Sequence, residues 1–158
     1  MTPRVILRKR DEVMIQFEME RVWMDETELF YQVQLQLRSS ACASNQLIYL
    51  DDASLGDLYQ KIDQFNQAWG KEPITWRLVN EEEGSDDLQV NLTFTLIDRI
   101  GTIQIDIFIH DEWQFDSFDH VHMKCRMRTT MVQLDDLSTQ VKRFIRRETD
   151  HVSSLRPE

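Results

Sequence analysis

The chain has 158 residues, of which 41% are hydrophobic and 29% charged, and it contains only four Gly and three Pro. This composition is typical of one globular domain and excludes a disordered or Gly-rich chain. The formal net charge of -10 repels phosphate backbones and attracts cations, so we expect no nucleic-acid partner and a preference for a basic protein. No stretch reaches about 18 apolar residues, and the run at 5–7 is too short for a signal peptide, so we expect no membrane partner and a cytoplasmic location.

The first part of the chain alternates apolar and polar residues, which is the period of a β-strand. The alternation predicts strands over residues 13–24, 29–37 and 46–50. The short polar link between the first two strands predicts a hairpin. On the first strand, the pattern places Trp23 on the same apolar face as Phe17 and Met19.

The apolar spacing then changes to three and four residues, which predicts an amphipathic helix. The stripe consists of Leu55, Leu58, Ile62, Phe65 and Trp69. Asp51, Asp52 and Ser54 are N-cap candidates, and Gly70 is expected to end the helix.

The second part of the chain repeats the sequence of strands followed by a helix. Alternation predicts strands over 74–78, 88–96, 103–109 and 121–127, and a second helical stripe covers 134–145. Residues 1–150 are therefore expected to form a single α+β domain, and 151–158 a frayed tail. Strands in runs with two separate helices predict a mainly antiparallel sheet of about six to seven strands, with both helices packed on one face.

Sequence motifs for catalysis are absent. The sequence has no G-x-S-x-G nucleophile turn, no G-x-x-x-x-G-K-S/T phosphate loop and no G-x-G-x-x-G, so we expect no enzyme and no cofactor. Cys42 and Cys125 form no C-x-x-C pair, and we expect two reduced thiols.

One alternative is a small metal-binding protein or enzyme that uses two histidines. His120 and His122 point to the same face of a predicted strand, and His110 and Asp111 are near in sequence. Two His and one carboxylate can hold zinc or iron. Three cations follow on the same strand face, however, which is typical of an ordinary solvated sheet face, so we expect no metal.

Two acidic clusters are the candidate partner-binding sites. The segment 111–119 interleaves aromatic and acidic residues, a combination that suits a basic partner because Trp is enriched at binding hot spots. A second cluster lies at the first strand pair. The candidate contact residues are Glu18, Glu20, Asp25, Glu26, Asp111, Glu112, Trp113, Phe115, Asp116 and Asp119. The alternative is that the aromatic residues pack a long loop against the core and the acids form a solvated edge.

The order of elements resembles that of the WapI-type immunity proteins, which accompany bacterial polymorphic toxins. The similar features are the opening strand pair, the helix after Leu50-Asp51-Asp52, the meander over 88–109 and the closing helix, and they cover nearly the whole chain. The resemblance implies a cytoplasmic antitoxin that binds and occludes a cognate toxin, often a basic nuclease. A structural homodimer that pairs edge strands or an uncovered sheet face is a further alternative.

Overall fold

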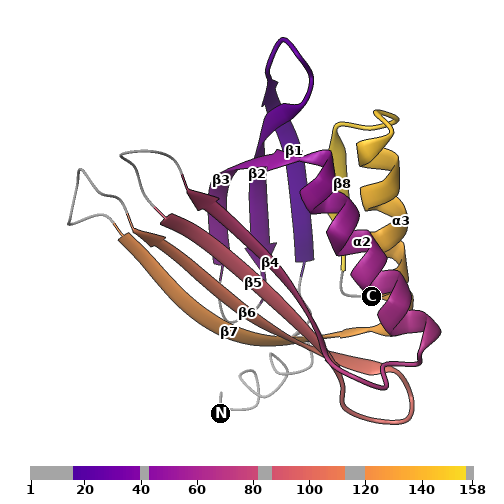
Figure 1. The fold of residues 1–158 in the computed structure, drawn as a ribbon. Helices are drawn as coiled ribbons and strands as arrows, with labels where there is room; N and C mark the ends of the chain where they lie inside the picture. Colours follow the sequence, from indigo (N-terminus) through magenta and orange to yellow (C-terminus); the bar gives the residue numbers. More distant parts are fainter. Residues whose placement is uncertain (1–15, 40–42, 82–86, 113–119, 156–158) are drawn as a thin grey trace, which may run out of the picture.

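The computed structural model describes residues 16–39, 43–81, 87–112 and 120–155. These residues form eight strands and two helices, which confirms the predicted α+β class with one strand more than expected (Figure 1). In chain order the elements are β1 (Gln16–Met24), β2 (Phe30–Arg38), β3 (Ala43–Asp51), α2 (Asp52–Gln67), β4 (Ile74–Glu81), β5 (Asp87–Leu96), β6 (Thr102–Glu112), β7 (His120–Thr130), α3 (Met131–Ile145) and β8 (His151–Ser154).

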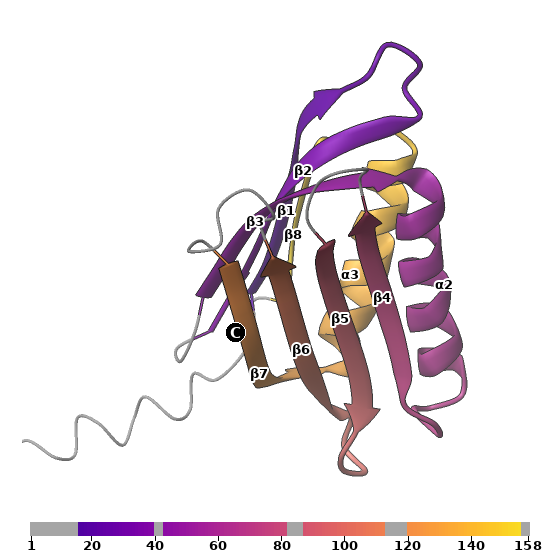
Figure 2. The same cartoon turned by 60° about the vertical axis from the view of Figure 1, so that its left-hand side comes forward.

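The strands are divided between two four-stranded sheets, where the sequence predicted one. The first sheet has the order β3-β2-β1-β8 and the second the order β4-β5-β6-β7, with antiparallel neighbours throughout. Each helix carries the chain from one sheet to the other, α2 from β3 to β4 and α3 from β7 to β8. The two helices lie side by side along one flank, beside β4 and β8 (Figures 1 and 2).

One hydrophobic core joins the apolar faces of the sheets and helices. The predicted stripe of α2 is buried at Leu55, Leu58, Ile62 and Phe65, whereas Trp69 is 57% exposed because the helix has already ended at Gln67. The caps are also defined: the Asp51 carboxylate accepts from the Ser54 N–H at 2.8 Å, and the Thr130 hydroxyl accepts from the Gln133 N–H at 3.1 Å. These bonds satisfy backbone donors in the first turn of each helix.

A β-bulge in β1 reverses which side chains face the core. Arg21 pairs with Val33 and Trp23 pairs with Gln32, so Val22 is the extra residue. Because neighbouring side chains in a strand alternate between faces, one inserted residue exchanges inward and outward positions beyond it. Trp23 is therefore 49% exposed, and its predicted place on the apolar face is wrong.

The predicted tail contains a strand. His151–Ser154 form β8, which pairs with residues 17–20 of β1, and the side chains of Val152 and Leu155 are buried. The Gln140 side chain on α3 holds this strand, because its Nε2 donates to Ser153 O at 2.7 Å and its Oε1 accepts from Ser153 N at 2.9 Å. Residues 151–155 thus belong to the domain.

Candidate functional site

The acidic cluster predicted near the first strand pair lies partly on the outer face of the first sheet. Glu20 is opposite Gln34 on β2, and Gln34 is opposite Leu47 on β3. Beyond the bulge, the next outward row contains Trp23, Gln32 and Tyr49. Strand register thus brings acids of β1 beside large apolar side chains of β1 and β3.

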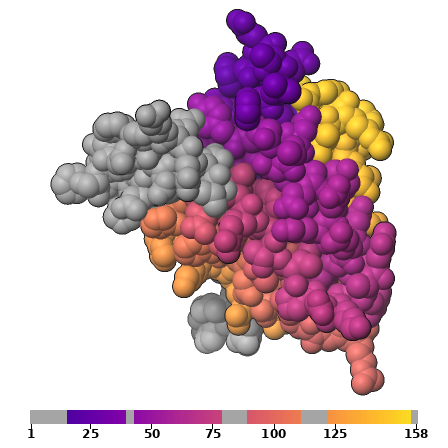
Figure 3. Space-filling model, in the orientation of Figure 1, coloured from indigo at the N-terminus to yellow at the C-terminus, as the bar shows by residue number. Residues whose placement is uncertain are grey.

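The outer face of the first sheet concentrates exposed apolar side chains. Trp23, Phe30, Leu47 and Tyr49 are between 42% and 53% exposed. With Val22 and Leu29 at the adjoining hairpin, this region contributes six of the ten exposed large hydrophobic residues in the described part of the chain. The β1–β2 hairpin, in indigo, projects from the top of the molecule (Figure 3). We call the set Glu18, Glu20, Trp23, Phe30, Leu47 and Tyr49 the acidic–aromatic face.

Asp25 has a structural role within the hairpin turn. Its carboxylate accepts from the Thr27 hydroxyl at 2.9 Å and from the Leu29 N–H at 3.1 Å. Desolvation raises the pKa of Asp25, but the hydrogen bonds from Thr27 and from the backbone N–H groups of residues 28–30 lower that pKa by more. Glu26 is exposed in the same turn, so of these two acids it is the one better placed to meet a partner.

Glu18 is engaged by side chains of two neighbouring strands, β2 and β8. Its carboxylate lies 3.1 Å from Arg38 Nη2 and 3.6 Å from His151 Nε2, and it accepts from the Ser153 hydroxyl at 3.3 Å. These contacts fix the carboxylate position at the β8 side of the acidic–aromatic face. Glu20, the next outward acid along β1, is exposed.

The second predicted cluster can be placed only in part. Asp111 and Glu112 end β6, while Trp113, Phe115, Asp116 and Asp119 lie outside the described residues. His120 begins β7, and His122 faces His110 of β6 with 3.3 Å between the two Nδ1 atoms. His122 is therefore paired with His110 across the strands. Within the described ranges, no group of three or more His, Cys, Asp or Glu side chains is arranged to hold a metal ion.

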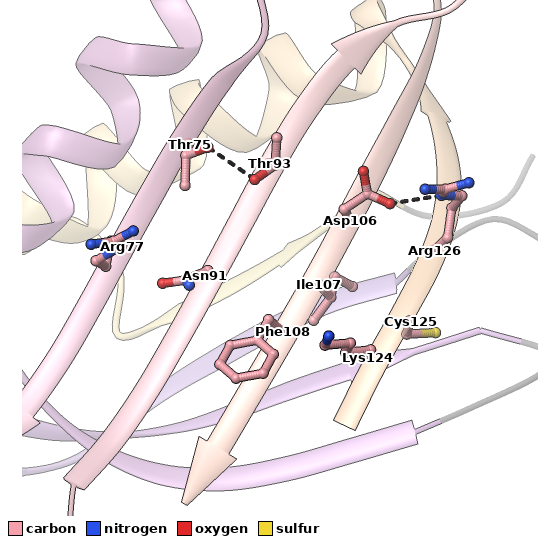
Figure 4. A pocket seen from close by; sticks show the side chains of 10 residues that line it. All are labelled: Thr75, Arg77, Asn91, Thr93, Asp106, Ile107, Phe108, Lys124, Cys125 and Arg126. Carbon is pink, nitrogen blue, oxygen red and sulfur yellow. Dashed lines mark hydrogen bonds and ion pairs between the residues drawn. The ribbon is translucent and has the colours of Figure 1, made fainter. Parts of the chain in front are cut away.

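The outer face of the second sheet carries a hollow of about 720 Å³. The sequence predicts an ordinary solvated face only for the β7 part of it. Its lining consists of Thr75 and Arg77 of β4, Asn91 and Thr93 of β5, Asp106, Ile107 and Phe108 of β6, and Lys124, Cys125 and Arg126 of β7 (Figure 4). Three of these side chains are cations and one is an acid, so the hollow has the opposite charge to the molecule as a whole.

Cys125 differs from the prediction of two reduced thiols, because it is disulfide-bonded. Cys42, the other cysteine of the sequence, lies outside the described residues. Disulfides are typical of oxidising compartments and rare in the cytosol. The state of Cys125 is therefore a direct test of the cytoplasmic location expected from the sequence.

Comparison with known proteins finds no matching family model, no matching curated protein and no matching solved structure. Neither of the helices described here has the length and apolar character needed to cross a membrane.

Proposed function

We propose that the protein binds a basic protein partner through the acidic–aromatic face and acts by occluding that partner, without catalysis. The observation that carries the proposal is the coexistence of four exposed large apolar side chains with Glu18 and Glu20 on one face of one sheet. The apolar and the acidic residues have different roles in binding.

The apolar part of the face supplies affinity. A cluster of exposed large apolar side chains is unfavourable in water, and such patches in soluble proteins often mark interaction sites. Trp and Tyr are enriched among hot-spot residues because burying a large ring contributes strongly to binding. Trp23 of β1 and Tyr49 of β3 lie on the two sides of Gln32 of β2, so they form the two ends of one row of the proposed contact.

The acidic part supplies orientation and speed. Glu20 and Glu26 are exposed near the projecting hairpin, and the net charge of -10 extends an attractive field toward a cationic partner. Such fields raise association rates and disfavour acidic competitors. A basic partner would meet an attractive potential before it contacts the aromatic residues.

The specific form of this proposal is an immunity protein that occludes a cognate toxin. It is supported by the resemblance in element order to WapI-type immunity proteins and by the acidic charge that suits a basic toxin. In this role the chain needs no catalytic group, because covering the toxin's active surface is sufficient.

The test is partner capture with matched variants. Tagged wild-type protein, Trp23→Ala and Ile100→Ala are used as bait in the native cell, and the captured protein is then measured by calorimetry. Ile100 is 86% exposed in the β5–β6 turn, so it controls for the loss of any surface hydrophobe. We expect Trp23→Ala to weaken binding by about 2 kcal/mol and Ile100→Ala to have no effect.

Two outcomes would contradict the proposal. One is a captured partner whose affinity is the same for wild type and Trp23→Ala. The other is a homodimer in light scattering that dissociates on Trp23→Ala, since the acidic–aromatic face would then be occupied by a second copy of this chain.

A further inference from the structure

The outer face of the second sheet has features of a second binding site with the opposite charge preference. Four residues stand directly opposite one another across all four strands: Arg77 of β4, Asn91 of β5, Phe108 of β6 and Lys124 of β7. Three strand spacings separate the outer two, or about 14 Å between backbones. The row thus has a cation at each end and a polar and aromatic floor (Figure 4).

In the adjacent row, the polar side chains of the four strands are paired with one another. The hydroxyls of Thr75 and Thr93 are hydrogen-bonded at 2.9 Å, and Arg126 Nε pairs with Asp106 Oδ1 at 2.8 Å. The charge of Arg126 is therefore balanced within its row. In contrast, Arg77 and Lys124 form no ion pair among the residues that the structure describes.

Asn91 presents an unsatisfied hydrogen-bonding group between these two cations. Its Oδ1 is buried and has no hydrogen-bond partner among the described residues, which is uncommon, because most buried polar atoms are paired. A side-chain amide offers both an acceptor and donors, the same combination that a peptide group presents in return. A ligand with a backbone amide would satisfy Asn91.

Phe108 gives the floor an apolar platform. Its ring is packed edge-on against the His122 ring at 5.4 Å between centroids, and the Lys124 Nζ lies 5.9 Å from its centroid. These neighbours hold the ring in place beside Asn91. An apolar side chain of a bound ligand can rest on such a ring while charged groups reach the two ends of the row.

We propose that the hollow binds an extended acidic segment of a second protein. Carboxylates of that segment pair with Arg77 and Lys124, a peptide group pairs with the Asn91 amide, and an apolar side chain packs on Phe108. A short acidic peptide is favoured over nucleic acid, because a long chain of phosphates is repelled by the net charge of -10 beyond the local cations. Together with the acidic–aromatic face, this site would let the protein join a basic and an acidic partner.

The site is tested by fluorescence anisotropy with a labelled peptide of about ten residues that alternates Glu and Ser around a central Phe. Such a peptide spans about 33 Å when extended, enough to cross the row. We expect saturable binding that Arg77→Gln with Lys124→Gln weakens about tenfold. The matched control is Lys71→Gln with Arg99→Gln, which removes two exposed cations that do not line the hollow.

Asn91→Asp and Asn91→Leu separate the roles of charge and hydrogen bonding. Asn91→Asp is expected to abolish binding by repulsion, and Asn91→Leu to weaken it, while circular dichroism stays unchanged for both. The proposal is overturned if the wild type does not bind the peptide, or if the control pair weakens binding as much as the test pair. It is also overturned if labelled oligothymidylate of equal charge binds more tightly than the peptide. None of these results depends on the acidic–aromatic face, so the two proposals fail independently.

Discussion

The guanidinium carbon of Arg21 on β1 lies 4.0 Å from the centroid of the Phe144 ring in the last turn of α3. Arg21 Nη2 also donates to Phe144 O at 3.1 Å, and its Nη1 pairs with Asp150. A cation is favoured near the carbonyl end of a helix, and a desolvated cation over an aromatic ring is more strongly attracted than an exposed one. With its side chain 4% exposed, Arg21 fastens the end of α3 to the first sheet.

We expect Arg21→Ala to lower the free energy of unfolding by about 2–4 kcal/mol, because it removes the stacked cation and leaves a buried carbonyl without its donor. Arg21→Lys should recover only part of this loss, since an ammonium lacks the planar fork that reaches both Phe144 and Asp150. Urea denaturation measures both variants. Arg99→Ala, at an exposed turn, is the control, and an equal effect of Arg21→Ala and Arg99→Ala would refute this role.

The second prediction concerns β8. Val152 is fully buried in the core, whereas Val132 on α3 is 75% exposed. Val152→Ala should destabilise the protein by about 2 kcal/mol, because it leaves a cavity under β8. Val132→Ala makes the same chemical change at an exposed helical position, where Ala is favoured by helix propensity, so it should be neutral or slightly stabilising. Thermal unfolding of the two variants compares them directly. Similar melting temperatures would show that residues 151–155 do not support the core.

The sequence patterns predict the elements well because each depends on local spacing. The stripe of Leu55, Leu58, Ile62 and Phe65 identifies α2, and the alternation of Ile103, Ile105, Ile107 and Ile109 identifies β6. The division into two sheets was not predicted, because a strand with one buried face has the same alternation in one sheet as in two. Only the helical crossovers, whose direction is set by tertiary packing, separate the sheets.

The candidate sites depend on strand register, which a single sequence does not reveal. Glu18 and Glu20 are visible as acids on one strand face, but Leu47 and Tyr49 join them only through pairing of β2 with β3. Phe30 is the exception, since it alternates with the buried Tyr31 in the sequence and its outward position follows from that pattern. In the same way, Arg77 and Lys124 are distant in sequence, and only the pairings through Asn91 and Phe108 place them in one row.

The third prediction is a pH dependence that arises between the helices. Asp63 of α2 accepts from Ser138 Oγ at 2.7 Å and pairs with Lys142 Nζ at 2.7 Å, both on α3. Desolvation raises the pKa of Asp63, but the hydrogen bonds from Lys142 and Ser138 lower that pKa by more, to below its usual value of 3.8. A lowered pKa in the folded state means that the stabilisation is present above about pH 4 and is lost as the pH falls through the folded pKa.

Asp63→Asn should therefore reduce stability at neutral pH by about 1 kcal/mol, with the difference from wild type shrinking in acid. Urea denaturation at several pH values measures this difference. Asp57→Asn on the same helix removes the more exposed carboxylate that pairs with Lys61 at 3.3 Å, and it is the control. A difference between wild type and Asp63→Asn that stays constant from neutral pH into acid would contradict the assignment.

The fourth prediction concerns the disulfide at Cys125. We expect Cys125 in the purified, unfolded protein to resist alkylation until a reductant is added, because the thiolate is the form that reacts. Peptide mapping by mass spectrometry measures the modification. The same measurement on protein alkylated inside intact cells addresses location, since a reducing cytosol would leave Cys125 open to modification. Alkylation of Cys125 in the purified protein without reductant would show that the bond does not form.

The last prediction tests electrostatic steering by the acidic–aromatic face. Glu20 is the suitable position for a charge reversal, because Glu18 is paired with Arg38 and Asp25 accepts hydrogen bonds that stabilise the hairpin turn. We expect Glu20→Lys to slow association with the captured basic partner, with a smaller effect on dissociation, since an exposed charge acts mainly before contact. Stopped-flow kinetics measures both rates.

Salt is the second variable in this experiment, because it screens charges. The Debye length falls from about 30 Å at 0.01 M to about 3 Å at 1 M. The difference in association rate between wild type and Glu20→Lys should therefore be largest at low ionic strength and nearly vanish at high ionic strength. The control is Glu72→Lys. Glu72 is exposed and follows α2 in the chain, and its reversal changes the net charge by the same amount. If Glu72→Lys slows association as much as Glu20→Lys, the total charge and not this face steers the partner, and the position of Glu20 carries no special role.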